Sequence, residues 1–355
     1  MFLVECEFRV ILSAKNAGWS FFILAIFATC AGCHSFKSNP FKSYVEMTPF
    51  VAHESGLHAK FFGNSTLIVK DSKTSVMIDG FFSRPGLLKL LFGQIEPNID
   101  RINVALTRGD VRKLNLLLVA HSHHDHAMDA PYVAKKTGAL LGGSSSTLRI
   151  AANGGIATSQ LRELVGGKSI SVGAFEIDVF ETPHSDNPIF KGHVDPLFQT
   201  PARLSDYKFD KNYSFLLKHR DGNILIVPSA NFECDMFAGV TADVVFLGVG
   251  NIGNKSKQFI YTFWEQAVLK TKAKLVVPIH WDNFLRSLNS ELVPFPRIFD
   301  DTARSVKYVQ ELGESFGIAV KFLPLYKPVA LPKVIFPTYE RIEHSHKPTS
   351  TCISN

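Results

Sequence analysis

A cluster of metal-binding side chains directly follows a buried strand in the first half of this chain. The stretch His121–His126 reads His-Ser-His-His-Asp-His, so four of the 13 histidines lie within six residues. The apolar run Leu114–Ala120 before it predicts a buried strand, which places the cluster on the turn where that strand ends. Alternate residues of an extended turn point the same way, so the first two ligands, His121 and His123, face one metal. The aspartate and the last histidine face a neighbouring position. Imidazole nitrogen and carboxylate oxygen together favour zinc, with iron or manganese as alternatives.

Two further histidines stand at predicted strand ends. The alternating segment Phe175–Thr182 runs into Pro183 and His184, and the β-branched run Lys274–Ile279 ends at His280. Either histidine alone has an equally good structural explanation, but together with the cluster they predict additional ligands. The remaining histidines lack this context and are expected to lie at the surface or behind the ligands: His34, His53, His58, His124, His193, His219, His344 and His346.

The order of these motifs resembles the metallo-β-lactamase superfamily of metal-dependent hydrolases. Residues Phe61–Val69 and Ser75–Gly80 are similar to the family's first hairpin, which ends in an aspartate near the metal site, here Asp79. The resemblance covers roughly residues 55–325 and is nearest to the branch of lactonases and phospholipase-D-like phosphodiesterases. It implies an α/β fold, a four-layer αβ/βα sandwich of two mixed β-sheets packed between helices. Strands alternating with helices, with early and late hairpins, favour the same architecture.

The resemblance also assigns ligands. It implies a first metal held by His121, His123 and His184, and a second held by Asp125, His126 and His280. The family's bridging aspartate follows a strand, which corresponds here to Asn223–Val227, and Ala230 stands where that carboxylate is expected. Glu233, Asp235 or Asp282 could replace it, although each is more typical of a surface carboxylate. The sequence therefore leaves open whether one or two zinc ions bind.

The chemistry implied by these ligands is hydrolysis by activated water. Three histidines leave a coordination position of zinc open, and a water bound there has a pKa of about 7. Asp125 is the candidate catalytic base if the second metal position is empty. If that position is filled, Asp125 is a ligand instead.

The N-terminus has the pattern of an export signal. Arg9 and Lys15 precede the apolar stretch Trp19–Ala31, which is too short for a membrane span and meets Gly32 and Cys33. Residues 1–33 therefore predict a lipoprotein signal with Cys33 as the lipid-modified residue, and residues 34–50 a tether. A simple cleaved signal or an uncleaved anchor are the alternatives. We expect an exported protein, anchored to a bacterial membrane on its periplasmic or cell-surface side.

Residues 51–327 are predicted to form one catalytic domain, followed by a polar tail over residues 328–355. Cys234 and Cys352 are too few to indicate a disulfide framework in a domain of this size, so Cys234 is expected to be a buried thiol.

The irregular segment Ser185–Asn212 is predicted to be a lid, with Phe190, Phe198, Tyr207 and several basic residues facing a substrate that is part apolar and part anionic. Further elements are expected at residues 127–138, 140–143, 144–153, 244–250, 258–272, 300–316 and 318–325.

Three functions fit the sequence. The preferred one is a membrane-tethered hydrolase of an ester, lactone or phosphodiester, with phospholipid-like substrates first because the enzyme already lies at a membrane. A β-lactam or thioester hydrolase of the same fold is the second. The third is a surface lipoprotein that binds metal or ligand without turnover, which the missing carboxylate at Ala230 keeps open. No basic tract interleaved with aromatic residues indicates a nucleic-acid partner, and the net charge of +6 is weak evidence for an anionic substrate or surface.

Overall fold

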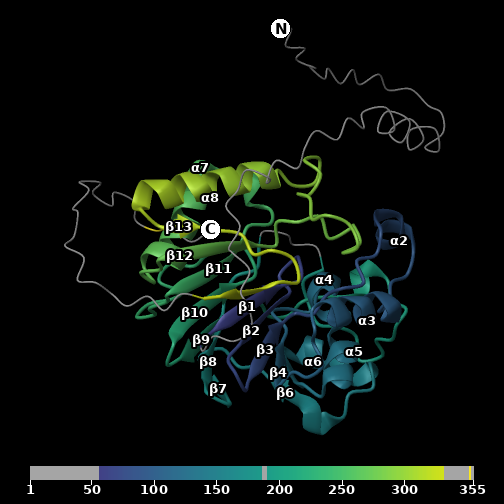
Figure 1. Cartoon of the computed structure of the whole chain (residues 1–355). Helices are drawn as coiled ribbons and strands as arrows, with labels where there is room; N and C mark the ends of the chain where they lie inside the picture. Colours follow the sequence, from purple (N-terminus) through teal and green to yellow (C-terminus); the bar gives the residue numbers. More distant parts are fainter. Residues whose placement is uncertain (1–55, 186–189, 332–351, 353–355) are drawn as a thin grey trace, which may run out of the picture. The chain divides into compact units, whose positions relative to one another are not determined.

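The computed structural model describes residues 56–185, residues 190–331 and Cys352. Two seven-stranded mixed sheets lie between layers of helices, as Figure 1 shows. Within each sheet, three antiparallel pairings are followed by three parallel pairings. This arrangement confirms the predicted four-layer α/β sandwich.

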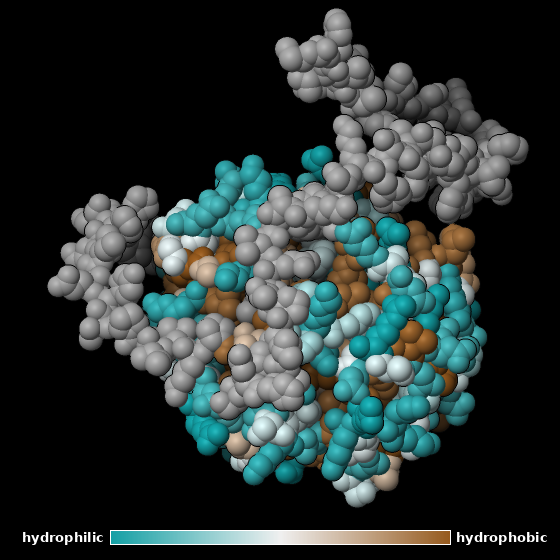
Figure 2. All heavy atoms as spheres, viewed as in Figure 1, coloured by the Kyte–Doolittle hydropathy of each residue, from teal (hydrophilic) through white to brown (hydrophobic). Residues whose placement is uncertain are grey.

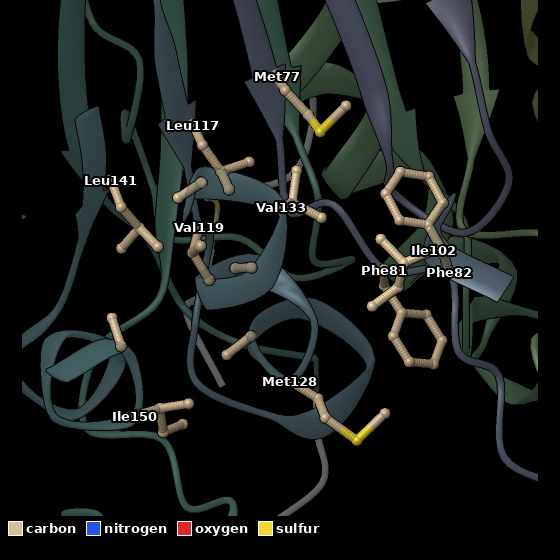
Figure 3. Close-up of a cluster of buried hydrophobic side chains, with 14 of the residues drawn as sticks. Met77, Phe81, Phe82, Ile102, Leu117, Val119, Met128, Val133, Leu141 and Ile150 are labelled. Atoms are coloured by element: carbon tan, nitrogen blue, oxygen red, sulfur yellow. The ribbon is translucent and has the colours of Figure 1, made fainter. Parts of the chain in front are cut away.

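The first sheet has apolar side chains on both faces. Its strands, in spatial order, are β14 (Pro328–Ala330), β1 (His58–Phe61), β2 (Leu67–Lys70), β3 (Ser75–Ile78), β4 (Leu116–Leu118), β5 (Leu140–Gly143) and β6 (Leu161–Glu163). Met77, Leu117 and Leu141 point into the core that the helices cover, which Figure 3 shows in close-up. Side chains alternate along a strand, so the equally buried Ile78 and Leu118 face the other way, toward the sandwich interior. Burial on both faces explains why these strands read as continuous apolar runs.

Five helices and a short 3-10 turn accompany this sheet: α2 (Leu87–Phe92), α3 (Ile99–Arg108), α4 (His124–Ala127), α5 (Ala130–Thr137), α6 (Ser145–Asn153) and η2 (Thr158–Gln160). The predicted helix over residues 127–138 is interrupted before α5. Asp129 stands at that break, and its side chain accepts hydrogen bonds from the backbone N–H of Phe82 and from the backbone N–H and hydroxyl of Ser83. The predicted serine cap of α6 is confirmed, since Ser144 Oγ accepts from the N–H of Thr147.

The second sheet repeats this plan. Its strands, in spatial order, are β13 (Ala319–Val320), β12 (Leu275–Ile279), β11 (Val244–Gly248), β10 (Gly222–Val227), β9 (Tyr213–His219), β8 (Phe175–Glu181) and β7 (Ser169–Val172). Its helical segments are η4 (Ile252–Asn254), α7 (Lys257–Trp264), the π-helical η5 (Glu265–Leu269) and α8 (Thr302–Phe316), while the short η3 (Leu204–Asp206) packs against the core of the first sheet. Figure 1 shows α7 and α8 on the outer side of this sheet. The strand predicted over residues 318–325 is shorter, because the chain leaves the sheet after Val320 and buries Phe322 and Leu323.

The domain extends past its predicted end at residue 327. Residues Pro328–Ala330 pair antiparallel with β1 as strand β14, so the start of the predicted polar tail belongs to the first sheet. The predicted signal and tether over residues 1–50 lie outside the described residues. Within the described part, no helix is long and apolar enough to cross a membrane.

The prediction that Cys234 is a free thiol is wrong. Cys234 and Cys352 form a disulfide across a sequence separation of 118 residues, with their Cα atoms 5.8 Å apart. Two isolated cysteines gave no sequence signal for pairing, because only the fold brings residue 352 back to the loop after β10. The bond links the far end of the chain to the domain.

We expect the variant Cys234→Ser to be less stable than the parent protein. A crosslink that closes a loop of this length restricts the unfolded chain, and its loss typically costs about 2–4 kcal/mol. Guanidinium unfolding of the oxidised parent, the reduced parent and the variant measures the effect. The reduced parent and the variant should unfold at the same lower midpoint, and coincident midpoints for all three would contradict the prediction.

Candidate metal centre

The predicted ligands lie at the carboxyl ends of strands from both sheets. Asp79 follows β3, the cluster that starts at His121 follows β4, His184 follows β8, and His280 follows β12. In α/β sheets this edge is where ligands bind, because the strands hold the backbone rigidly and the following loops are free to vary. The fold therefore brings together predicted ligands up to 159 positions apart, the separation between His121 and His280.

The first ligand group comprises His121, His123 and His184. One nitrogen from each lies within 4.8 Å of the others, and the Nε2 atoms of His121 and His184 are 3.1 Å apart. His184 Nδ1 lies 2.7 Å from the carbonyl oxygen of Ser185, to which it donates as the Nδ1–H tautomer, leaving its Nε2 lone pair directed at the centre. Phe209 stacks on the ring of His184, with centroids 4.4 Å apart, and fixes its plane.

The second group comprises Asp125, His126 and His280. Asp125 Oδ2 lies 3.4 Å from His126 Nε2 and 3.3 Å from His280 Nε2. Two ligand atoms at zinc bond lengths of about 2.05 Å and a tetrahedral angle stand about 3.3 Å apart, so these separations fit one shared ion. The residues present therefore suit a metal at both groups, and the structure brings together all six predicted ligands.

Asp79 orients His126 from behind. The Oδ2 atom of Asp79 lies 2.7 Å from His126 Nδ1, and its Oδ1 accepts from the N–H of Ala120. Ser65 Oγ donates to Asp79 Oδ2 at 2.5 Å and lies 3.1 Å from His126 Nδ1. A carboxylate on one ring nitrogen fixes the tautomer, so Nε2 is presented to the metal. The structure thus places Asp79 in contact with His126, one of the predicted ligands.

The turn before β2, within the predicted first hairpin, supports the other two ligands of the second group, a role that the sequence analysis did not assign to it. Asn64 donates from Nδ2 to the backbone oxygen of Asp125 at 2.8 Å, and its own backbone oxygen accepts from the N–H of His280 at 2.7 Å. The N–H of Asn64 donates to Asp282 Oδ1, and Asp282 is paired with the buried Arg84 at 2.7 Å. Asp282 is therefore neither a surface carboxylate nor a replacement ligand, because its oxygens are engaged behind the site.

The strand end at His280 is tightly constrained. His280 has a φ of 57°, in the left-handed region that side chains other than glycine rarely adopt. A Cβ at Gly250, in the loop after β11, would lie 2.8 Å from His280 Nδ1. Only glycine lets the backbone at residue 250 lie this close to the His280 ring, so the second group requires Gly250. The sequence analysis had identified Gly250 only as the end of a predicted strand.

Burial keeps the first group unprotonated. It lowers the pKa of His121 and His123 well below the usual 6.5, with help from the neighbouring histidines, and lowers that of His184 to about 4. Neutral imidazoles with converging lone pairs are the state that a metal ion requires.

The second group is more strongly charged. Burial lowers the pKa of His126, but the carboxylates of Asp79 and Asp125 outweigh it and raise that pKa to about 10. Burial likewise opposes ionisation of Asp125, yet His126 and His280 hold its pKa well below the usual range. A metal ion entering this group takes the place of a proton on His126.

Both groups open into a cavity of about 260 Å³. Ala230 lines it and is 3% exposed, so the expected bridging position carries no carboxylate. His124 also lines it and is buried, contrary to the expectation of a peripheral histidine. Within the described residues, the side-chain atoms His124 Nε2 and Tyr207 Oη are buried without a hydrogen-bond partner.

The predicted lid is largely a packed part of the domain. Phe190 and Tyr207 line the cavity as expected, but Phe198 is buried in the hydrophobic core of the first sheet, where it packs on Tyr207. The basic residues of the segment do not line the cavity: Lys191, Arg203, Lys208 and Lys211. Lys211 instead pairs with Glu181 at the surface. Phe198 and Tyr207 of this irregular segment are core residues, which the absence of periodicity concealed.

We expect Asp79→Asn to weaken metal binding at the second group by about 10- to 100-fold, because an amide no longer fixes the His126 tautomer. Zinc titration with a chromophoric competitor measures this. Asp129→Asn is the matched control, since Asp129 is equally buried and hydrogen-bonded but accepts its hydrogen bonds from Phe82 and Ser83, away from the ligands. Equal losses in both variants would indicate general destabilisation rather than a defect at the ligand.

Known proteins similar to this chain include metal-dependent hydrolases, in agreement with the geometry of the candidate metal centre. The sequence profile of the Metallo-beta-lactamase superfamily matches residues 59–198. A UPF0173 protein of Pyrococcus furiosus is 24% identical over 166 residues, which cover 47% of this chain and 67% of that protein. A UPF0173 metal-dependent hydrolase of Heliobacterium modesticaldum is 31% identical over 85 residues, which cover 24% of this chain and 29% of that protein.

A solved structure shares the fold. Igni18, a metallo hydrolase from Ignicoccus hospitalis, superposes with a TM-score of 0.51 at 15% identity, covering 77% of this chain and 97% of its own. The two mixed sheets, the ligand order along the strand ends and the matched profile agree with one another. Together these findings support assigning the chain to the metallo-beta-lactamase superfamily, whose profile matches residues 59–198.

Proposed function

We propose that this protein uses metal-activated water to cleave an ester, lactone or phosphodiester bond, with phospholipid-like phosphodiesters as the leading class and zinc as the metal. The observation that carries the proposal is the convergence of six candidate ligand residues, five histidines and one aspartate in two groups, on one cavity. Hydrolysis needs this combination, because the ligands must be buried and rigid while the reacting position stays open.

The residues have separate tasks. His121, His123 and His184 would hold the first ion, and Asp125, His126 and His280 the second. A divalent ion held there supplies Lewis acidity, which lowers the pKa of bound water to about 7. Asp125 accepts the proton of the attacking water when only the first group is loaded, because its carboxylate lies in the same cavity and is ionised at neutral pH. With both groups loaded, Asp125 is a ligand and that role passes to solvent.

The cavity wall supports an amphipathic substrate. Phe190, Phe284 and Phe295 line it together with the side chains of Tyr207 and His124. A phosphodiester or ester with an apolar substituent matches this mixture, with the anionic or carbonyl centre at the ligand groups and the substituent against the rings. β-Lactam or thioester hydrolysis is the second candidate, because it would use the same metal-activated water.

We also propose an exported protein that is anchored at a membrane surface by lipid at Cys33. The disulfide between Cys234 and Cys352 supports export, because such bonds persist in oxidising compartments. Figure 2 shows hydrophobic residues interspersed with hydrophilic ones on the viewed face. Exposed apolar side chains that would suit contact with lipid lie on α2 and before α8: Leu88, Leu91, Phe92, Ile298 and Phe299.

The test is reconstitution of the chelator-stripped protein. Zinc, iron and manganese are added back separately, and bound metal and hydrolysis are measured on bis-p-nitrophenyl phosphate, a p-nitrophenyl ester, a lactone and a β-lactam. We expect hydrolysis to follow metal content and to be fastest with the phosphodiester. A β-lactam preference would move the assignment to the second candidate. Metal binding with no turnover on any of the four would support a binding protein without catalysis.

We expect Ala230→Asp to strengthen metal binding at the second group by about tenfold or more, because the variant adds an anionic ligand in the cavity. Ala238→Asp is the control, since residue 238 is exposed and the added charge is the same. Metal content at limiting zinc, with the affinity from competition titration, measures the difference. Equal affinities in both variants would mean that residue 230 does not reach the ions.

A further inference from the structure

One wall of the cavity is built from three phenylalanines that follow β12. Phe284, Phe295 and Phe299 all line the cavity. The ring centroids of Phe284 and Phe295 are 4.8 Å apart, and those of Phe295 and Phe299 are 6.0 Å apart. Phe284 also packs at 5.7 Å from the ring of His280, so this aromatic wall, Phe284, Phe295 and Phe299, begins beside a ligand of the second group.

A buried carboxylate stands at the far end of the aromatic wall. Asp300 lines the cavity and is 6% exposed. Its Oδ2 accepts from the N–H of Asn251 at 2.9 Å and from Thr302 Oγ1 at 3.2 Å. Its Oδ1 is buried and has no hydrogen-bond partner among the described residues. Burial also raises the pKa of Asp300, which shows that its surroundings penalise an uncompensated negative charge.

The described lining residues offer Asp300 no permanent positive charge, since His280, the lining histidine that influences it, is a candidate metal ligand. They include no lysine or arginine. A half-satisfied buried carboxylate is costly unless a donor or an opposite charge pairs with it, so the missing partner would come from whatever occupies the cavity. Phenyl rings select among possible partners, because the negative face of an aromatic ring attracts a cation.

We propose that Asp300 and the aromatic wall form a subsite for an organic ammonium group of the substrate. The inference rests on the proposed hydrolysis, which it makes more specific: the scissile ester or phosphodiester lies at the histidine groups, and a primary or quaternary ammonium lies against Asp300. The two positions adjoin each other. Asn251 bonds Asp300, and the preceding Gly250 abuts His280. Such a substrate carries a cation near its cleaved bond, as in a zwitterionic lipid headgroup or a soluble amino-alcohol ester.

Direct binding tests the subsite without turnover. The metal-loaded protein is titrated with choline and with 3,3-dimethyl-1-butanol, its neutral isostere with carbon in place of nitrogen, and binding is followed by ligand-observed NMR. We expect choline to bind about tenfold or more tightly, the discrimination that a cation–π and carboxylate site provides. In Asp300→Asn the preference should fall to about twofold or less. Asp301→Asn is the matched control, because Asp301 caps α8 and pairs with Arg297 but does not line the cavity. It should keep the preference.

Hydrolysis gives the second readout. The values of kcat/KM are compared for p-nitrophenyl phosphorylcholine and for p-nitrophenyl 3,3-dimethylbutyl phosphate, and the parent should prefer the cationic ester in an Asp300-dependent manner. Choline release from phosphatidylcholine micelles, set beside the soluble ester, distinguishes a lipid source from a free one. Equal binding of choline and its isostere overturns the subsite, whatever is hydrolysed. Selective choline binding with no hydrolysis of either ester supports the subsite and counts against the proposed reaction.

Discussion

His121→Ala should remove metal from the first group and lower the metal-dependent hydrolysis rate by at least about 10²- to 10³-fold. A Lewis acid is worth several kcal/mol to hydrolysis, and each 1.4 kcal/mol corresponds to a factor of ten in rate. His121 is central to this loss because its Nε2 lies 3.1 Å from His184 Nε2, and its ring packs against His123 and His126. Elemental analysis of bound metal, beside kcat/KM on bis-p-nitrophenyl phosphate, measures both effects.

The control for that variant is His219→Ala. His219 is also buried but lies in β9, where it is paired with Asp71 and Asp221 away from the cavity. The control should keep its metal and its activity once folded, whatever it loses in stability. If His121→Ala retained a full complement of metal and turned over at the parental rate, the first group would not be the catalytic centre.

Metal affinity should depend strongly on pH at the second group and only weakly at the first. The pKa of His126 is about 10 in the metal-free protein, so an ion entering the second group displaces one proton at any pH below that value. Its apparent dissociation constant should fall about tenfold for each unit that the pH rises between 6 and 9. In the first group the pKa values are lowered, to about 4 for His184, so no proton has to leave above pH 6 and the affinity there should change little.

Calorimetric zinc titrations in buffers of different ionisation enthalpy measure the protons released per ion. We expect about one proton for the second group and close to none for the first. Asp79→Asn should reduce the proton release at the second group, because the variant lacks the negative charge that contributes most to raising the pKa of His126. Equal release at both groups would show that His126 is already neutral in the metal-free protein.

The ligand set was predictable because its signals are local. A histidine at the end of an apolar strand is visible in sequence at His184 and His280, and the spacing from His121 to His126 needs only one turn. The supporting residues were less visible. Asn64 and Gly250 act through contacts across 61 and 30 positions, with Asp125 and His280 respectively, and nothing in their immediate neighbourhood marks them.

Carboxylates were the hardest residues to assign. Asp282 had the sequence context of a surface residue, yet it is buried against Arg84, and the overlooked Asp300 lines the cavity. Whether a carboxylate is a ligand, half of an ion pair or a surface group depends on which charges the fold places beside it, and these partners are remote in sequence. Cys234 illustrates the same point, since its partner is Cys352.

The sequence by itself determined the strand-rich α/β class and indicated the six candidate ligands, because hydrophobic periodicity and ligand spacing are properties of neighbouring residues. Tertiary structure decided the rest: the pairing of β14 with β1, the burial of Phe198 and the disulfide at Cys234. It also decided the placement of Asp300 at the end of the aromatic wall. These features join segments far apart in the chain, and they form only when burial of the apolar strands has brought those segments together.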